Sequence, residues 1–187
     1  MSAVAETGAA AASGSTVQQR AWDIAAAVPD PELPVLTIAE LGILRNVEVF
    51  DAGRPGGAAG KPSVRVTITP TYSGCPAMDA IRAGIREAFA RVGGPDVEVV
   101  TVLAPAWTTD WMSAGARAKL EALGIAPPGG RSQAGGHSGP VRLALQVLCP
   151  HCHSLDTREL SRFGSTSCKA LYVCGGCGEP FDYFKVL

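Results

Sequence analysis

Hydrophobic and polar residues recur with different periods along the chain, and these periods predict the order of its elements. Helical spacing in VQQRAWDIAAAV (17–28) predicts a helix that Thr16 caps and Pro29 ends, with four apolar side chains available for burial: Val17, Trp22, Ile24 and Val28. Strict alternation predicts strands at 43–50 and 63–71, the second with one apolar face made of Val64, Val66 and Ile68. The Gly- and Pro-rich segment between the two strands is a loop, so the strands form a hairpin.

A second set of periods continues the pattern. YSGCPAMDAIRAGIREAFARVGG predicts a helix with Pro76 in its first turn and Gly93 and Gly94 at its end. DVEVVTVLA (96–104) predicts a third strand, and TTDWMSAGARAKLEALGI (108–125) a third helix with Trp111, Leu120 and Leu123 as its apolar contacts. The order indicates an α+β fold: a small α/β sandwich, in which helices pack on a three-stranded sheet, followed by a small β ribbon.

Changes in composition divide the chain into four parts. Residues 1–15 are an Ala/Gly/Ser tail that is too poor in large side chains to fold alone, so we expect disorder there. The α/β domain then covers 16–125, and the Pro/Gly/Ser-rich segment 126–140 is a linker. Residues 141–187 form a second unit that is too small to be held by an apolar core alone, so bound metal would have to stabilise it.

Charge and targeting signals narrow the function classes. Sixteen Lys and Arg against 17 Asp and Glu leave a net charge of -1, which gives no strong field for nucleic acid or an anionic membrane. No stretch approaches the ~18 consecutive apolar residues of a membrane span. The first residues lack the charged and apolar parts of a secretion signal, so we expect a cytoplasmic protein with reduced thiols.

Five of the six cysteines lie in CPHCHSLDTRELSRFGSTSCKALYVCGGC (149–177). Two CxxC motifs can each turn two sulfurs toward one ion, and together they predict a metal site made of Cys149, Cys152, Cys174 and Cys177. Zinc is the leading ion because it favours tetrahedral thiolates, and an iron-sulfur cluster is the alternative. CPHCH has the spelling of a haem attachment site, but that chemistry needs export. A thioredoxin-like redox motif would need a helix that neither CxxC context indicates.

Cys168 is the fifth thiol of this stretch. Beside Lys169 it is either a small buried residue or an additional metal ligand. A fifth sulfur near the ion would favour ligand exchange or a cluster, and a buried one would favour plain structural zinc. His151 and His153 flank the first motif and are interpreted as solvated residues.

Cys75 is the cysteine of the first domain. It follows Ser73 and Gly74 at the end of a predicted strand and precedes Pro76 at a predicted helix start, where the helix dipole favours a thiolate that can bind a soft metal. A buried turn cysteine is the equal alternative. Because one thiolate cannot hold iron or a cluster, neighbouring ligands or a second copy in a homodimer would have to complete the site.

Two further motifs of the first domain are interpreted as structural. Asp30 and Glu32 lie on a proline-stiffened turn in which Asp30 can cap the residues after Pro31, and Thr37 and Glu40 have capping-box spacing. No Ser/His/Asp set, phosphate loop or dinucleotide fingerprint is present, so we assign no catalytic residue.

DPELPVLTIAELGILRNVEV and VTITPTYSGCPAMDAI resemble the domain shared by cytosolic iron-sulfur assembly factors and bacterial metal-sulfur cluster biosynthetic proteins, over about 17–125. The most constant residues of that family fall on the DPE turn, at Asp30, Pro31 and Glu32, and on the T-x-x-x-C-P motif, at Thr71, Cys75 and Pro76. The resemblance implies a transient iron or iron-sulfur site at Cys75, with Asp30, Glu32 and Thr71 around it.

FGSTSCKALYVC and EPFDYFK, joined to that first domain, resemble the PaaD family, small subunits encoded with the multicomponent phenylacetyl-CoA epoxidase. The resemblance implies an accessory role in aerobic phenylacetate breakdown, with the other epoxidase subunits as partners and oxygen chemistry on a separate di-iron subunit. It leaves three functions open: iron or cluster assembly, structural docking in the complex, and electron transfer by a cluster at the C-terminal cysteines.

Overall fold

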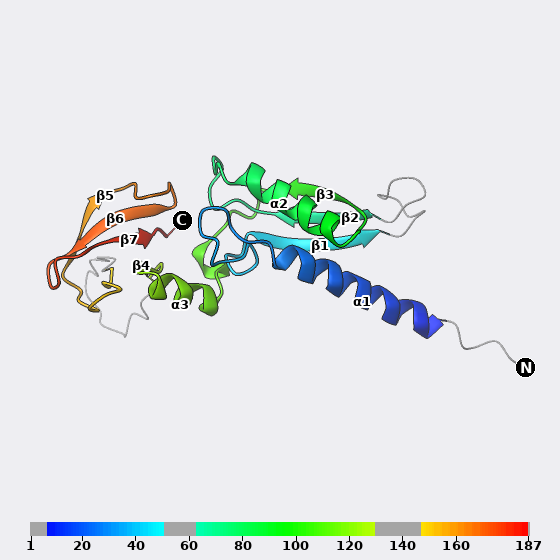
Figure 1. The fold of residues 1–187 in the computed structure, drawn as a ribbon, viewed down its shortest axis with the longest axis horizontal. Helices are drawn as coiled ribbons and strands as arrows, with labels where there is room; N and C mark the ends of the chain where they lie inside the picture. Colours follow the sequence, from blue (N-terminus) through cyan, green and yellow to red (C-terminus); the bar gives the residue numbers. More distant parts are fainter. Residues whose placement is uncertain (1–6, 51–62, 130–146, 187) are drawn as a thin grey trace, which may run out of the picture. The chain divides into compact units, whose positions relative to one another are not determined.

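The computed structural model describes residues 7–50, 63–129 and 147–186, and the chain divides into two compact units, Met1–Trp107 and Thr108–Leu187. Within its described residues, the first unit contains two helices and three strands (Figure 1): α1 (Thr7–Ala26), β1 (Leu44–Phe50), β2 (Ser63–Ile68), α2 (Met78–Arg91) and β3 (Asp96–Thr101). The described residues of the second unit form a 3-10 turn, one helix and four strands: η1 (Thr109–Trp111), α3 (Ala114–Ala122), β4 (Ile125–Ala126), β5 (Thr157–Ser161), β6 (Lys169–Cys174) and β7 (Pro180–Phe184). The α+β fold class is therefore confirmed.

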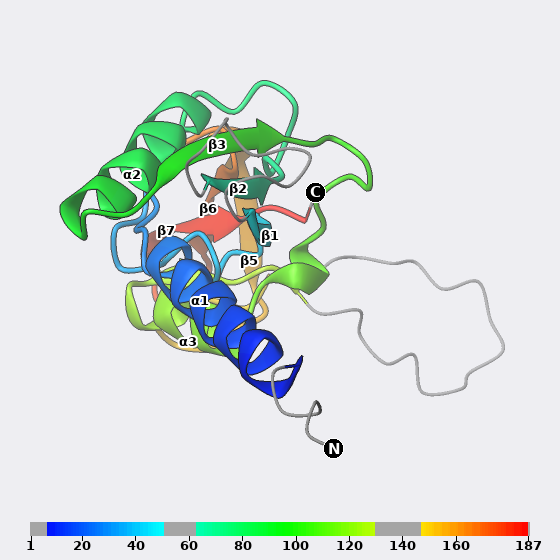
Figure 2. The same cartoon turned by 90° about the vertical axis from the view of Figure 1, so that its right-hand side faces the viewer.

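The first sheet has the order β1-β2-β3, with β1 antiparallel and β3 parallel to β2. The antiparallel pair confirms the predicted hairpin, whose loop lies outside the described residues. α1 packs on β1, α2 packs on β3, and the two helices contact each other beside the sheet (Figure 2). The predicted apolar face of β2 is buried, as are the apolar side chains of α2: Ile81, Ile85 and Phe89.

α1 differs from its prediction in its start and in its buried face. It begins at Thr7 instead of Thr16, since the alanine-rich segment before Thr16 has high helix propensity. Val17 is 46% exposed, whereas the small Ala21 and Ala25 are buried. Alanines let the helix approach the sheet closely, and Gln18 accepts a hydrogen bond from the Val49 N–H of edge strand β1 at 3.2 Å.

The ends of α2 and of the third helix also differ from their predictions. α2 begins at Met78, so Pro76 precedes the helix and does not lie in its first turn, while the end at Gly93, with a φ of 63°, is confirmed. The predicted helix 108–125 is interrupted because Ser113 has extended backbone geometry and its side chain accepts the N–H of Ala116 at 3.0 Å. η1 therefore precedes α3, and Ile125 lies in a strand.

The second sheet has the order β4-β7-β6-β5, in which β4 is parallel to β7 and the other pairs are antiparallel. Ala126 pairs with Tyr183 and is 1% exposed in the core of the ribbon. The structure therefore divides the chain after Trp107, and not at the expected boundary between 125 and 126, because β4 adds Ala126 to the core of the ribbon and α3 packs on β4. Most of the expected linker 126–140 and the start of the expected unit 141–187 lie outside the described residues.

Among the described residues, the helices are too short or too polar to cross a membrane.

Candidate metal centre

Two tight turns of the second unit bring four cysteine sulfurs together. The Sγ atoms of Cys149, Cys152, Cys174 and Cys177 all lie within 4.8 Å of one another. The Cys149–Cys177 sulfurs are 3.8 Å apart and the Cys152–Cys174 sulfurs 3.5 Å apart. A tetrahedral ion with Zn–S bonds of about 2.3 Å requires sulfurs about 3.8 Å apart, so the group fits one ion. The predicted grouping of these four cysteines is confirmed.

The two turns have the same backbone geometry. In each, the carbonyl oxygen of the first cysteine, Cys149 or Cys174, accepts a hydrogen bond of 2.9 Å from the N–H four residues later. The N–H of the same cysteine donates to the carbonyl oxygen five residues later, at 3.0 Å in both turns. The residue after the second cysteine position has a left-handed conformation, at His153 with φ 58° and at Gly178 with φ 81°. Local sequence therefore builds both halves of the site.

The electrostatics of the group favour a bound cation. The Cys177 N–H lowers the pKa of the Cys174 thiol to about 7. The Ser154 N–H acts on Cys152 in the same direction, but the sulfurs of Cys174, Cys177 and Cys149 together with desolvation raise the pKa of Cys152 to about 12. Four thiolates this close repel one another unless a cation lies among them. The donor set therefore fits a soft divalent ion, whose charge would keep all four sulfurs deprotonated.

The other candidate ligands of this unit lie elsewhere. Cys168 is buried and its sulfur contacts Thr166 Oγ1 at 3.0 Å. It precedes β6, at the opposite end from Cys174, about 20 Å away at 3.3 Å per residue. The structure therefore does not bring Cys168 to the four-cysteine group. His151 and His153 are exposed and outside that group, as interpreted from the sequence.

α3 supports the first turn, which the sequence did not indicate. Gly124, at φ 72°, follows α3, and a Cβ there would come within 2.9 Å of the His151 ring. His153 Nδ1 lies 3.8 Å from Glu121 Oε1. The Arg117 guanidinium donates to the carbonyl oxygens of Thr109 and Pro128, at 2.6 and 2.8 Å, and so holds both ends of this segment. Gly124 was the sequence signal for this close approach, but His151, which it contacts, is distant in sequence.

In the first unit, Cys75 lies in the loop after β2. Its N–H donates to the Tyr72 carbonyl oxygen at 3.2 Å, and α2 begins three residues later. Burial is the largest influence on this half-buried thiol and raises its pKa. The negative charges of Glu32 and Asp30 also raise the pKa, whereas hydrogen bonds from the Ala77 N–H and the Thr71 side chain lower it by less. Of the two alternatives that the sequence left open, the structure favours the turn cysteine over the helix-start thiolate, because the loop puts Cys75 outside the helix and desolvates it.

The DPE turn is built by Asp30. This carboxylate is 6% exposed, and its Oδ1 accepts the N–H groups of Glu32 and Leu33 at 2.9 and 2.8 Å. Its capping role is confirmed, and both Asp30 and Glu32 lie near enough to Cys75 to influence its ionisation. Within the described parts of the chain, the only set of three or more His, Cys, Asp or Glu side chains able to share an ion is the four-cysteine group.

Thr37 and Glu40 form the expected capping box. The Thr37 N–H donates to Glu40 Oε2 at 3.0 Å, and the Glu40 N–H donates to Thr37 Oγ1 at 3.2 Å. This reciprocal pair fixes the chain between the DPE turn and β1.

Comparisons with known proteins agree with this division. Residues 22–102 match the iron-sulfur cluster assembly protein family, and residues 134–185 match the PaaD zinc beta ribbon domain. A crystal structure of a domain of unknown function (DUF59) from Bacillus anthracis aligns with a TM-score of 0.50 and 25% identity, over 59% of this chain and 96% of that one.

Two relatives extend the match in sequence. The "Fe-S protein maturation auxiliary factor" of Porphyromonas gingivalis is 37% identical over 50% of this chain and 80% of its own length. One subunit of the "putative 1,2-phenylacetyl-CoA epoxidase" of Escherichia coli is 48% identical over 89% of this chain and 91% of its own length. Since that identity spans both units, the chain belongs to the PaaD family, in which an iron-sulfur cluster assembly domain precedes a zinc β ribbon.

Proposed function

We propose that this chain is an accessory subunit of a multicomponent phenylacetyl-CoA epoxidase and helps to install iron or an iron-sulfur cluster in it. The observation that carries this proposal is the 48% identity to an epoxidase subunit across both units. The match of its first unit to iron-sulfur assembly proteins supports the assembly role. We place this assembly role in the cytoplasm, where thiols are reduced.

Cys75 is the proposed transient ligand, and iron or a cluster is the cargo. Burial and the charges of Glu32 and Asp30 raise the pKa of the thiol, so the free protein holds it protonated at neutral pH. The same carboxylates create a negative potential that attracts a cation, which then displaces the proton. The Thr71 hydrogen bond stabilises the thiolate. One thiolate binds metal weakly, so the recipient or a second copy must complete the ligand set before transfer.

The ribbon is proposed to hold zinc permanently as a docking module. Its four sulfurs are spaced for one tetrahedral ion. A multi-iron cluster would need some of the sulfurs farther apart, because the four cysteines would bind two iron atoms in pairs or four iron atoms singly. Zinc also has no redox chemistry, which suits a structural role. The spacing therefore argues against the electron-transfer alternative.

Cys75→Ser tests the assembly role. The variant should fold and keep its ribbon metal, because Cys75 lies in a half-buried loop outside the four-cysteine group, while the partner oxygenase is isolated short of iron. Ser73→Ala, an exposed change in the same loop, is the matched control and should leave the oxygenase fully loaded. Normal oxygenase iron with Cys75→Ser, together with stoichiometric co-purification, would instead indicate a purely structural subunit.

A further inference from the structure

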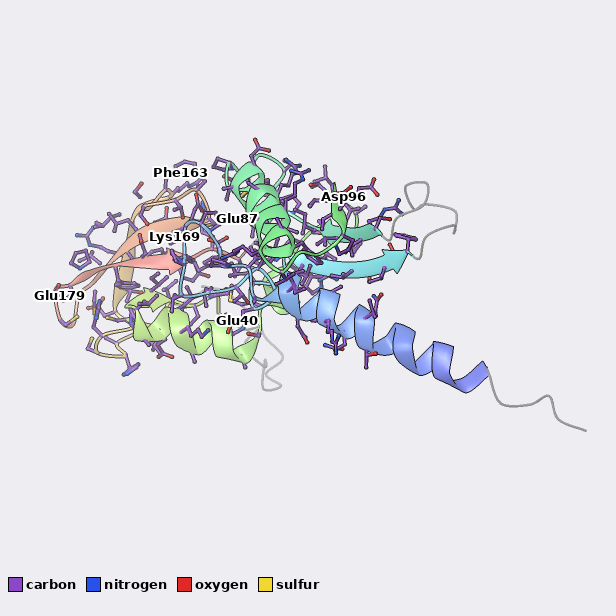
Figure 3. All side chains as sticks on the ribbon, turned by 45° about the vertical axis from the view of Figure 1, so that its right-hand side comes forward. Glu40, Glu87, Asp96, Phe163, Lys169 and Glu179 are labelled. Atoms are coloured by element: carbon purple, nitrogen blue, oxygen red, sulfur yellow. The ribbon has the colours of Figure 1, made fainter. Side chains whose placement is uncertain are left out.

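The loop between β5 and β6 lies at the end of the ribbon opposite the metal centre. Cys174 pairs with Thr157 at the metal end, whereas Lys169 pairs with Phe184 at the other. Because the three strands are antiparallel, the end of β5, the start of β6 and the end of β7 meet there. Figure 3 shows Glu179 and Phe163 at opposite ends of the ribbon. The assembly role proposed for this chain does not use this second end.

A buried ion pair lies beneath this loop. Lys169 is 5% exposed, and its Nζ lies 3.5 Å from Asp182 Oδ2, which also accepts the Ser165 hydroxyl at 2.8 Å. The Gly164 N–H donates to the Lys169 carbonyl oxygen at 2.9 Å, and a Cβ at 164 would come within 2.5 Å of Asp182 Oδ1. Burying a lysine in so small a unit is costly, so the pair indicates that the loop must keep one conformation.

The fixed loop presents an exposed aromatic side chain. Phe163 is 67% exposed, more than any other large hydrophobic side chain in the part of the chain that the structure describes. Its N–H donates to Ser161 Oγ at 3.2 Å, and Lys185 Nζ lies 4.8 Å from its ring centroid. Lys185 Nζ also donates to the Arg162 carbonyl oxygen at 3.2 Å. The ring is therefore ordered in advance, which lowers the entropy cost of binding.

Phe163 and its neighbours in the chain segments that meet at this end of the ribbon form what we call the Phe163 patch: Leu160, Arg162, Phe163, Lys185 and Val186. Leu160 is the bulged residue between the paired Glu159 and Ser161 and is 46% exposed, and Val186 is 45% exposed. The Lys185 ammonium lies over the ring, Arg162 precedes Phe163 in the chain, and the nearby Asp182 is held by Lys169 and Ser165. The patch is therefore apolar at its centre and positively charged at its edge.

We propose that the Phe163 patch is the surface by which the ribbon docks on another epoxidase subunit, into an apolar pocket rimmed by carboxylates. This inference rests on the proposed function for the identity of the complex. An exposed, preorganised aromatic side chain with a cation at its rim has the composition of an interface hot spot. A second copy is disfavoured because a symmetric contact would oppose like charges. Nucleic acid and anionic membranes are disfavoured because the chain has a net charge of -1.

Binding of the full-length, metal-loaded chain to the purified oxygenase subunits tests the proposal. Phe163→Ala should raise Kd at least about 10-fold. Lys185→Ala should raise it less and should flatten the dependence of Kd on salt. Val92→Ala, at a 61% exposed site of the first unit, is the matched control and should leave Kd unchanged. Unchanged metal content and thermal midpoint in Phe163→Ala would show that the exposed substitution leaves the fold intact.

A Kd for Phe163→Ala within twofold of the wild-type value would overturn the proposal, as would no wild-type binding. Phe163-dependent binding to single-stranded DNA or to anionic phosphatidylserine vesicles, or Phe163-dependent self-association, would also overturn it. Cys75→Ser separates this inference from the proposed function, since it should bind normally and leave the oxygenase short of iron. If Phe163→Ala binds normally while Cys75→Ser still fails to load the oxygenase, only the docking inference fails.

Discussion

The two units of this molecule use cysteine in opposite ways. In the second, four sulfurs lie within 4.8 Å of one another and local N–H groups lower the pKa of Cys174 to about 7. In the first, Cys75 is the lone cysteine, and burial raises the pKa of its thiol. A closed shell of four donors suits an ion that stays, whereas one shielded thiol beside two carboxylates suits an ion in transit. The number and ionisation of nearby donors therefore separate a resident metal from a transferred one.

Removing one ligand of the closed shell should have the largest effect. Cys174→Ser is expected to lose the ribbon metal and unfold the second unit, since structural zinc contributes on the order of 10 kcal/mol to such modules. Amide NMR signals from 108–129 and 147–186 should collapse, while those of the first unit persist on its own apolar core. Cys168→Ser is the control and should keep the metal. Retention of metal and of those signals by Cys174→Ser would contradict the account.

A smaller effect tests whether α3 belongs to the metal-bearing unit. Ser113→Ala removes the side-chain cap on the Ala116 N–H and should destabilise the second unit by about 1 kcal/mol. The change is measured as the midpoint of thermal unfolding, monitored by release of the ribbon metal. Ser113→Asp, which can still cap the helix, should restore that midpoint. If Ser113→Ala lowers only the midpoint of the first unit, the division after Trp107 is wrong.

The smallest effect concerns the ionisation of Cys75. Glu32→Gln removes a negative charge that raises the pKa of the thiol, so the pKa should fall in the variant. The folded protein binds this proton more tightly than the unfolded chain, so the raised pKa stabilises the fold below the ordinary value near 9. That stability is lost as pH rises through the folded-state pKa. The rate of Cys75 alkylation as a function of pH measures the change. An identical profile in Glu32→Gln would show that the Glu32 carboxylate does not affect the pKa of the thiol.

Local motifs were predictable from the sequence, and distant pairings were not. The two CxxC turns and the Thr37–Glu40 box depend on hydrogen bonds between residues close in the chain, so their spacing predicted their geometry. The parallel pairing of Ala126 with Tyr183 joins segments far apart in sequence, and no local pattern indicated it. That pairing assigns α3 and β4 to the ribbon, so the boundary between the units lies after Trp107 and not after 125.

The sequence left the ionisation of Cys75 open for the same kind of reason. Its motif predicted a position at a helix start, but the ionisation of the thiol depends on burial and on Glu32 and Asp30 from a distant turn. The role of Cys168 was open in the sequence because only the length of β6 separates it from the four-cysteine group.

Metal analysis with an absorption spectrum, on wild type and Cys75→Ser purified without air, tests the separation of resident and transferred metal most directly. We predict one zinc per chain in both proteins and no visible absorption from the four-cysteine group. Iron and sulfide at the ribbon, with visible absorption that persists in Cys75→Ser, would contradict that separation.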